Sequence, residues 1–133
     1  MKIERLPDAE LDIMKVLWQS DTPLKASDIA KRLSEKHSWK VPTVHAFLSR
    51  LEDRGFIIAD RSSYFHRFSA AITEPEYISA ESVQLLKKSG TKLPAMVAAL
   101  IDSEEITNEE LSELYALIDE KMKALKEKNE ASK

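Results

Sequence analysis

The 133-residue sequence contains no cysteine, which excludes disulfide bonds, thiolate metal sites and cysteine nucleophiles. Its first residues are charged and lack the apolar run of a secretory signal, and no apolar segment approaches the ~20 residues that cross a bilayer. Glycine-rich phosphate loops and zinc-protease motifs are also missing, and the 3 histidines are too few for a convincing acid–base site. These absences predict a cytoplasmic protein without membrane insertion, cofactor or metal. Among the possible classes of protein, an enzyme is therefore the least favoured.

Charge is unevenly distributed along the chain. The formal net charge is −3, but residues 1–70 carry 12 Lys and Arg against 10 Asp and Glu, a net charge of +2. Residues 71–133 carry 8 against 13, a net charge of −5. This asymmetry suits a protein that docks its basic half on phosphates.

The most informative part of the sequence is residues 42–68. A helix-sized segment, 42–55, ends at Gly55, and two alternating runs at 56–61 and 64–69 follow, joined at residues 62–63. Apolar spacing predicts two earlier helices, over 8–20 and 26–36, with a short strand at Leu24. The order helix, helix, helix, hairpin predicts a winged helix-turn-helix, which usually places its third helix in the DNA major groove.

After residue 70 the pattern is wholly helical. Thr-x-x-Glu capping boxes at Thr73 and Thr107 predict two helix starts, and a short apolar helix over 93–102 lies between them. The polar tail from about 126 is expected to fray. We therefore predict a mainly α (α+β) fold, with a winged-helix DNA-binding domain over 1–70 and a helical dimerisation domain over 71–133.

The last two helices are strongly apolar, and these side chains need a surface on which to be buried. The residues concerned are Leu93, Met96, Val97, Leu100, Ile101, Leu111, Leu114, Ile118 and Met122. One interpretation is that the helices fold back onto the winged helix. The favoured interpretation is a homodimer, in which a two-fold axis also supplies the second DNA half-site.

Four segments together resemble a known family. They are the first helix with Glu10, Met14 and Trp18, the pattern T-V-x-x-x-L-x-R-L-x-x-x-G over 43–55, the aromatic-rich stretch 64–68, and the apolar and acidic stretch 96–106. In this order and spacing, across about residues 6–125, they resemble the BlaI/MecI/CopY family of bacterial repressors, which includes the penicillinase repressors. The resemblance implies a dimeric repressor bound to a pseudo-palindromic double-stranded DNA operator.

The resemblance and the side-chain chemistry together suggest the DNA-facing residues. The candidates are Lys40, Thr43, His45, Ala46, Ser49 and Arg50 on or beside the third helix, and Arg61, Tyr64, His66 and Arg67 on the wing. Several alternatives stay open. Thr43 could serve only in helix capping, Arg50 could brace the fold through a carboxylate, and His45 could either alter base preference or be merely solvated.

Neighbouring residues are expected to have structural or solvent-exposed roles without contact to a ligand. Phe47, Phe65 and Phe68 are expected in the core, and Glu52 and Asp53 are expected to face water. His37 and His66 are expected at the surface or on the wing, not as metal ligands.

Two departures from the family limit what the resemblance implies. Copper-responsive members use a cysteine cluster, which this chain lacks, so that sensing mode is excluded. In the β-lactam-responsive members a protease pathway cuts an Asn-Phe bond in the dimerisation region, and the corresponding pair here is Ala99-Leu100. We therefore predict release from DNA by loss of dimerisation, with the participation of an inactivating protease left open. The rival class is a winged helix used only for protein association.

Overall fold

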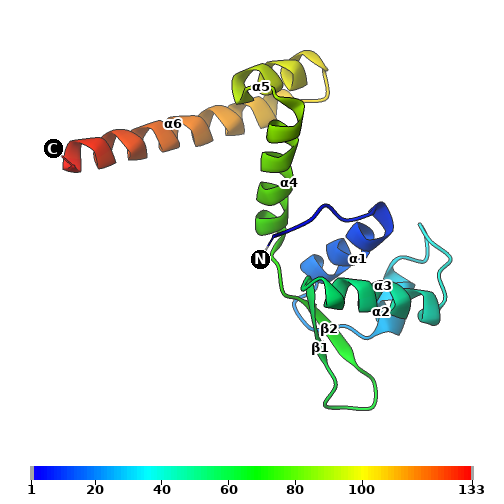
Figure 1. The fold of residues 1–133 in the computed structure, drawn as a ribbon. Helices are drawn as coiled ribbons and strands as arrows, with labels where there is room; N and C mark the ends of the chain where they lie inside the picture. Colours follow the sequence, from blue (N-terminus) through cyan, green and yellow to red (C-terminus); the bar gives the residue numbers. More distant parts are fainter. Residues whose placement is uncertain (1, 133) are drawn as a thin grey trace. The chain divides into compact units, whose positions relative to one another are not determined.

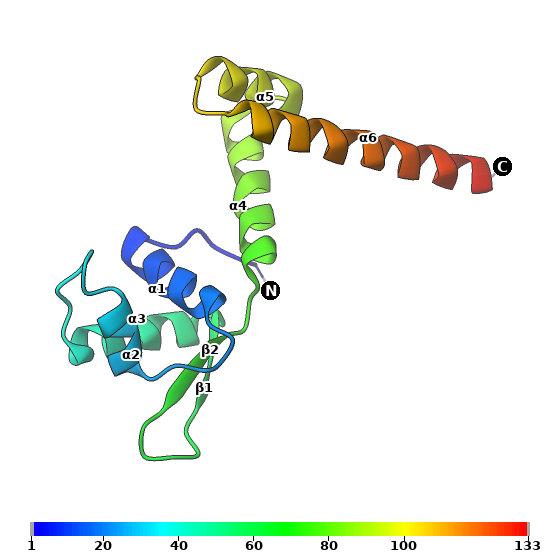
Figure 2. The same cartoon turned by 180° about the vertical axis from the view of Figure 1, so that it is seen from behind.

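The computed structural model describes residues 2–132 and forms two compact units, Met1–Leu85 and Leu86–Lys133. The first unit contains α1 (Asp8–Gln19), α2 (Ala26–Arg32), α3 (Val41–Asp53), β1 (Ile57–Asp60) and β2 (Arg67–Ala70). Helix α4 (Glu74–Ser89) begins in this unit and crosses the boundary into the second one. Figures 1 and 2 show the hairpin β1–β2 projecting from the three packed helices. This is the winged helix-turn-helix that the sequence predicts.

The core of the first unit forms where the apolar faces of its three helices meet the hairpin. Val44, Leu48 and Leu51 on α3 are buried, together with Ile13 and Met14 on α1. Leu24 forms the predicted short strand as an isolated bridge: its N–H donates to Phe68 O at 2.9 Å, and its carbonyl accepts from Phe68 N at 2.7 Å. The third helix and the wing are therefore fixed to one rigid body.

Gly55 ends α3 as predicted. Its φ of 80° lies in the left-handed region that favours glycine. Phe56 N donates to Leu51 O at 2.9 Å, and Gly55 N donates to Glu52 O at 3.0 Å, the two bonds of a Schellman cap. This cap turns the chain directly from α3 into the wing.

The hairpin turn is longer than the sequence suggests. The strands pair only from Ile57↔Ala70 to Asp60↔Arg67, and the loop between them spans 61–66. Asp60 Oδ1 accepts a hydrogen bond from Ser62 N at 2.9 Å, and Ser63 Oγ donates to Phe65 O at 3.0 Å. These local bonds replace the strand ladder. The prediction that Phe65 belongs to the core is consequently wrong, because its side chain is 62% exposed.

Two helix ends also differ from the prediction. Helix α2 stops at Arg32 and not near Lys36, because the chain turns so that Lys36 and His37 reach Asp12 on α1. The last helix continues through Ala131, beyond the expected boundary near 126, and fraying of the tail stays a prediction. Its Lys, Glu and Ala residues have high intrinsic helix propensity, which polarity alone does not reveal.

The first turn of α4 belongs to the core of the first unit. Tyr77 is buried, and its hydroxyl accepts a hydrogen bond from Leu6 N at 3.0 Å. Trp18 Nε1 donates to Ile72 O at 2.8 Å, and the Trp18 ring lies 5.8 Å from that of Tyr77. Compact packing therefore extends beyond residue 70. The assignment of residues 71–133 to dimerisation stays a prediction.

The second unit contains the end of α4, α5 (Leu93–Asp102) and α6 (Asn108–Ala131). Thr107 caps α6: its hydroxyl accepts from Glu110 N at 3.1 Å, and the Glu110 carboxylate accepts from Thr107 N at 3.1 Å. No residue of α5 or α6 is buried. Within residues 2–132, no helix is both long enough and apolar enough to span a membrane.

Candidate nucleic-acid interface

The exposed side of α3 carries the residues that the sequence assigns to DNA. Because α3 buries its apolar stripe, Thr43, His45, Ala46, Ser49 and Arg50 are exposed on its other side. Lys40, which precedes the first helical residue, is also exposed. The surface is polar and cationic, and hydroxyl, imidazole and guanidinium groups can all bond to phosphates or base edges.

Thr43 and Arg50 are not committed to structural contacts. In the part of the chain that the structure describes, the start of α3 has no side-chain cap, so the capping alternative for Thr43 is wrong. No carboxylate of residues 2–132 forms an ion pair with Arg50, which also removes the bracing alternative. The Arg50 guanidinium instead lies 5.6 Å from the centre of the Phe47 ring. Its N–H donors are left available.

A groove between the starts of α2 and α3 and the wing brings several predicted residues together. It is lined by Lys25, Ala26, Ser27, Val41, His45, Tyr64, Phe65 and His66. His45 from the helix therefore shares one surface with Tyr64 and His66 from the wing loop. The His45 ring also lies edge-on to Phe68, with 6.1 Å between the ring centres.

Lys25 is a cation of this surface that sequence reasoning missed. Its Nζ lies 5.3 Å from the centre of the Phe65 ring, a cation–π contact between the start of α2 and the wing loop. Lys25 is the N-cap residue of α2, and its backbone N–H donates to Asp28 Oδ2 at 3.1 Å. No sequence signal pairs it with Phe65, because the contact joins two loops that are far apart along the chain.

Arg61 is engaged within the chain. Its guanidinium donates two hydrogen bonds to the Glu52 carboxylate, at 2.8 and 2.6 Å. The hydrogen bond from Arg61 holds the pKa of Glu52 below its ordinary value, and the same contact raises the pKa of Arg61. The prediction that Glu52 simply faces water is therefore wrong. Arg67, in contrast, is exposed on β2 in register with Asp60.

Among residues 2–132, no group of three His, Asp or Glu side chains could hold a metal ion. His66 is exposed on the wing loop, whereas His37 is half-buried and bonds to Asp12 Oδ2 at 2.8 Å. The surface can therefore supply hydrogen bonds and positive charge to a polyanion.

Comparison with known proteins gives consistent matches. The family model described as "Penicillinase repressor" matches residues 6–120. The penicillinase repressor of Bacillus licheniformis is 30% identical over 128 residues, which cover 95% of this chain and 98% of that protein. The transcriptional regulator BlaI of Mycobacterium tuberculosis is 26% identical over 99 residues, 72% of each chain. A solution structure of the DNA-binding domain of the repressor BlaI aligns with a TM-score of 0.50 and 29% identity, covering 57% of this chain and 92% of that one.

Proposed function

Because the chain belongs to the penicillinase repressor family, we propose that it is a sequence-specific, dimeric DNA-binding repressor of transcription that acts at a pseudo-palindromic operator. One observation carries this proposal: the exposed side of α3 is polar and cationic, and it adjoins the wing in a single surface. Protein-docking helices instead present apolar anchors on the exposed side.

The surface residues divide into two kinds of DNA contact. Thr43, His45, Ala46, Ser49 and Arg50 project from α3 and are proposed to meet base edges and the adjoining phosphates in the major groove. The remaining set, Lys40, Tyr64, His66 and Arg67, is proposed to bind the sugar–phosphate backbone, and Arg61 joins it if its ion pair with Glu52 opens.

Dimerisation is proposed from the second unit. Leu93, Leu100, Ile118 and Met122 are between 50% and 65% exposed, and Ile101 is 41% exposed. Met96, Val97, Leu111 and Leu114 are only half-buried. Water contact on so much apolar surface is unfavourable, and pairing with a second copy across a two-fold axis removes it.

Release from DNA is proposed to follow loss of the dimer. Two tethered winged helices bind a two-site operator roughly 10²–10⁴ times more tightly than one, by effective concentration alone. The Ala99-Leu100 bond lies inside α5, where Ala99 O and Leu100 O both accept hydrogen bonds from Ser103. A protease that cuts there needs this helix to unwind first.

A second candidate, protein association through the wing, has one observation in its favour. Tyr64 is 90% exposed and Phe65 is 62% exposed, and their rings form an edge-to-face pair with centres 5.0 Å apart. An exposed aromatic pair of this kind is a plausible anchor for a protein partner. DNA binding is preferred because the helix beside it, α3, offers no apolar anchor of similar size.

The test is a selection of genomic DNA fragments by the full-length protein, followed by footprinting and titration of the recovered duplex at several salt concentrations. We expect two-fold symmetric protection and a linear dependence of log affinity on log salt, with a slope of about −0.9 for each phosphate neutralised. Arg50→Ala and Thr43→Ala should weaken binding while leaving a folded dimer. Lys87→Ala, which removes an exposed cation from α4, is the matched control and should leave base selectivity unchanged.

The outcome separates the two candidates. If the recovered duplexes share no sequence, or if both α3 variants bind like the parent protein, the reading surface lies elsewhere. If the parent protein binds no DNA but captures another protein, and Tyr64→Ser abolishes that capture, the association function replaces the repressor function.

A further inference from the structure

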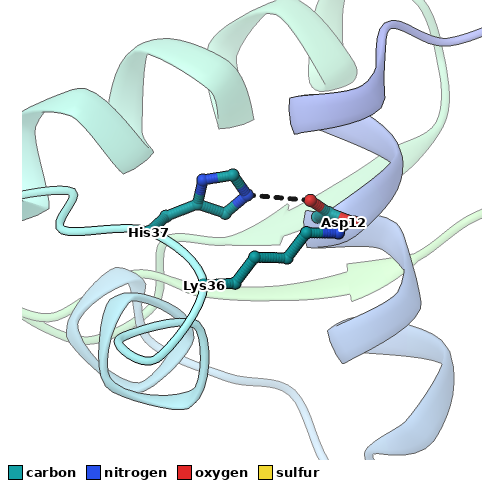
Figure 3. Close-up of polar contacts among 3 residues, drawn as sticks. All are labelled: Asp12, Lys36 and His37. Carbon is teal, nitrogen blue, oxygen red and sulfur yellow. Dashed lines mark hydrogen bonds and ion pairs between the residues drawn. The ribbon is translucent and has the colours of Figure 1, made fainter.

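Asp12 is a buried carboxylate in the middle of α1 that the DNA-binding proposal does not use. Only 7% of the residue is exposed. His37 Nε2 lies 2.8 Å from Asp12 Oδ2, and Lys36 Nζ donates to Oδ1 at 3.1 Å. Figure 3 shows both side chains reaching the carboxylate from the turn between α2 and α3. Burial raises the pKa of Asp12, but the hydrogen bonds from His37 and Lys36 outweigh it and hold the pKa below its ordinary value.

The His37 ring begins a series of aromatic contacts. It stacks on the Trp39 ring with 3.8 Å between centres and 4° between planes. Since the bond to Asp12 leaves the imidazole little freedom to rotate, the stack also fixes the indole. The turn before α3 is thereby tied to the middle of α1 through side chains.

The series continues into α3. The Trp39 ring packs against Phe47 with 4.9 Å between centres and a tilt of 49°. Phe47 in turn lies below the Arg50 guanidinium, one helical turn further along the same helix, at 5.6 Å. Each member contacts the next one, and Arg50, the last member, is exposed.

We propose that Asp12 and His37 are positioning residues for operator binding, which hold Arg50 in its DNA-facing orientation through Trp39 and Phe47. The proposal rests on the proposed DNA-binding function. A guanidinium supported by a ring face keeps all its N–H donors for phosphate or guanine, whereas a guanidinium supported by a carboxylate does not. A side chain that is already oriented loses less conformational entropy on binding.

The test is a double-mutant cycle in the full-length protein with the duplex recovered from the genomic selection. We expect His37→Ala to lower affinity by about three- to tenfold in the parent protein, the size of one lost cation–π or aromatic contact. In an Arg50→Ala background the same change should lower affinity by less than about twofold, since the group being positioned is gone. Trp39→Leu keeps an apolar side chain but removes the ring, and it should reproduce this coupling.

Lys36→Met is the matched control. It removes the other donor to Asp12 and one positive charge, while every residue of the aromatic series and the His37–Asp12 pair are kept. Its effect on affinity should be the same factor in the parent and in the Arg50→Ala background. Urea unfolding of each variant confirms that the assay compares folded proteins. If His37→Ala is unfolded, His37→Phe replaces it.

A second measurement does not need DNA. The Nε–H signal of Arg50, assigned by its disappearance in Arg50→Ala, should shift in His37→Ala and Trp39→Leu because the ring current of Phe47 no longer acts at a fixed distance. Equal factors for His37→Ala in both backgrounds, or an unmoved Arg50 signal, overturn the positioning role. If the parent protein selects no duplex, the proposed function fails, and the Arg50 signal alone then decides whether His37 positions Arg50.

Discussion

The ion pair between Glu52 and Arg61 restrains a cation of the wing that could otherwise bind a DNA phosphate. Removing the carboxylate is therefore expected to change operator binding. In Glu52→Gln the bidentate carboxylate is lost, and Arg61 becomes free to reach a phosphate. We expect tighter operator binding and a steeper salt dependence. One additional phosphate contact changes the slope by about −0.9, so lowering the salt fourfold should increase the gain in affinity by about 3.5-fold.

Fold stability should change little in this variant. The Arg61 side chain is 53% exposed and that of Glu52 is 31% exposed. Solvent screens such pairs, so they contribute little to the stability of the fold. A large increase in affinity would therefore come from the released guanidinium and not from a looser winged helix.

The assay is fluorescence anisotropy with the selected duplex between about 50 and 200 mM KCl. Asp53→Asn is the matched control, because it removes the same charge from the neighbouring exposed position and frees no cation among residues 2–132. It should shift affinity modestly without the full change in slope. If Glu52→Gln binds more weakly than the parent, the pair holds the wing in its binding position, and the reasoning is refuted.

Three further predictions concern stability and assembly. Tyr77→Phe removes the acceptor for the buried Leu6 N–H, so urea unfolding should show a loss of about 1–3 kcal/mol, and a loss below ~0.5 kcal/mol would contradict the role of this bond. Because the folded pKa of Asp12 is lowered, its ionised form stabilises the fold above its ordinary pKa of 3.8, and this contribution is lost as the pH falls through the folded value. Asp12→Asn should therefore be less stable at neutral pH and lose less stability in acid, and parallel pH curves from urea titrations would argue against it. Leu100→Asp places a carboxylate on the proposed dimer surface, so sedimentation should show monomers where the parent is dimeric, and operator affinity should fall by ~10²-fold or more; an unchanged dimer with full affinity would refute gating by dimerisation.

Local patterns were sufficient to predict the order of elements and most of the core. Apolar spacing and the Gly55 cap identified α3, and the Thr-x-x-Glu sequences located two helix starts, because each signal lies within one or two turns of chain. The hairpin was correct, but its loop was not. The alternation that suggested a strand from residue 64 continued into a loop held by side-chain hydrogen bonds.

Contacts between distant segments could not be predicted in the same way. Glu52 and Arg61 lie on a helix and on a loop beyond the next strand, so no helical or strand period relates them. Asp12 and His37 are 25 positions apart, and nothing near either residue indicates its partner. The residues of α3 that are proposed to face DNA were identified from the family resemblance and their side-chain chemistry. The side chains that are proposed to position Arg50 were found only from the folded chain.

The bond between Leu6 and Tyr77 has a consequence for the order of events during synthesis. The two residues are 71 positions apart, and the Tyr77 ring occupies the core next to Trp18. Until Tyr77 has been synthesised, the nascent winged helix lacks this ring and the hydroxyl that accepts the hydrogen bond from Leu6 N. A newly made chain therefore completes the core of its winged helix only after α4 has started to emerge.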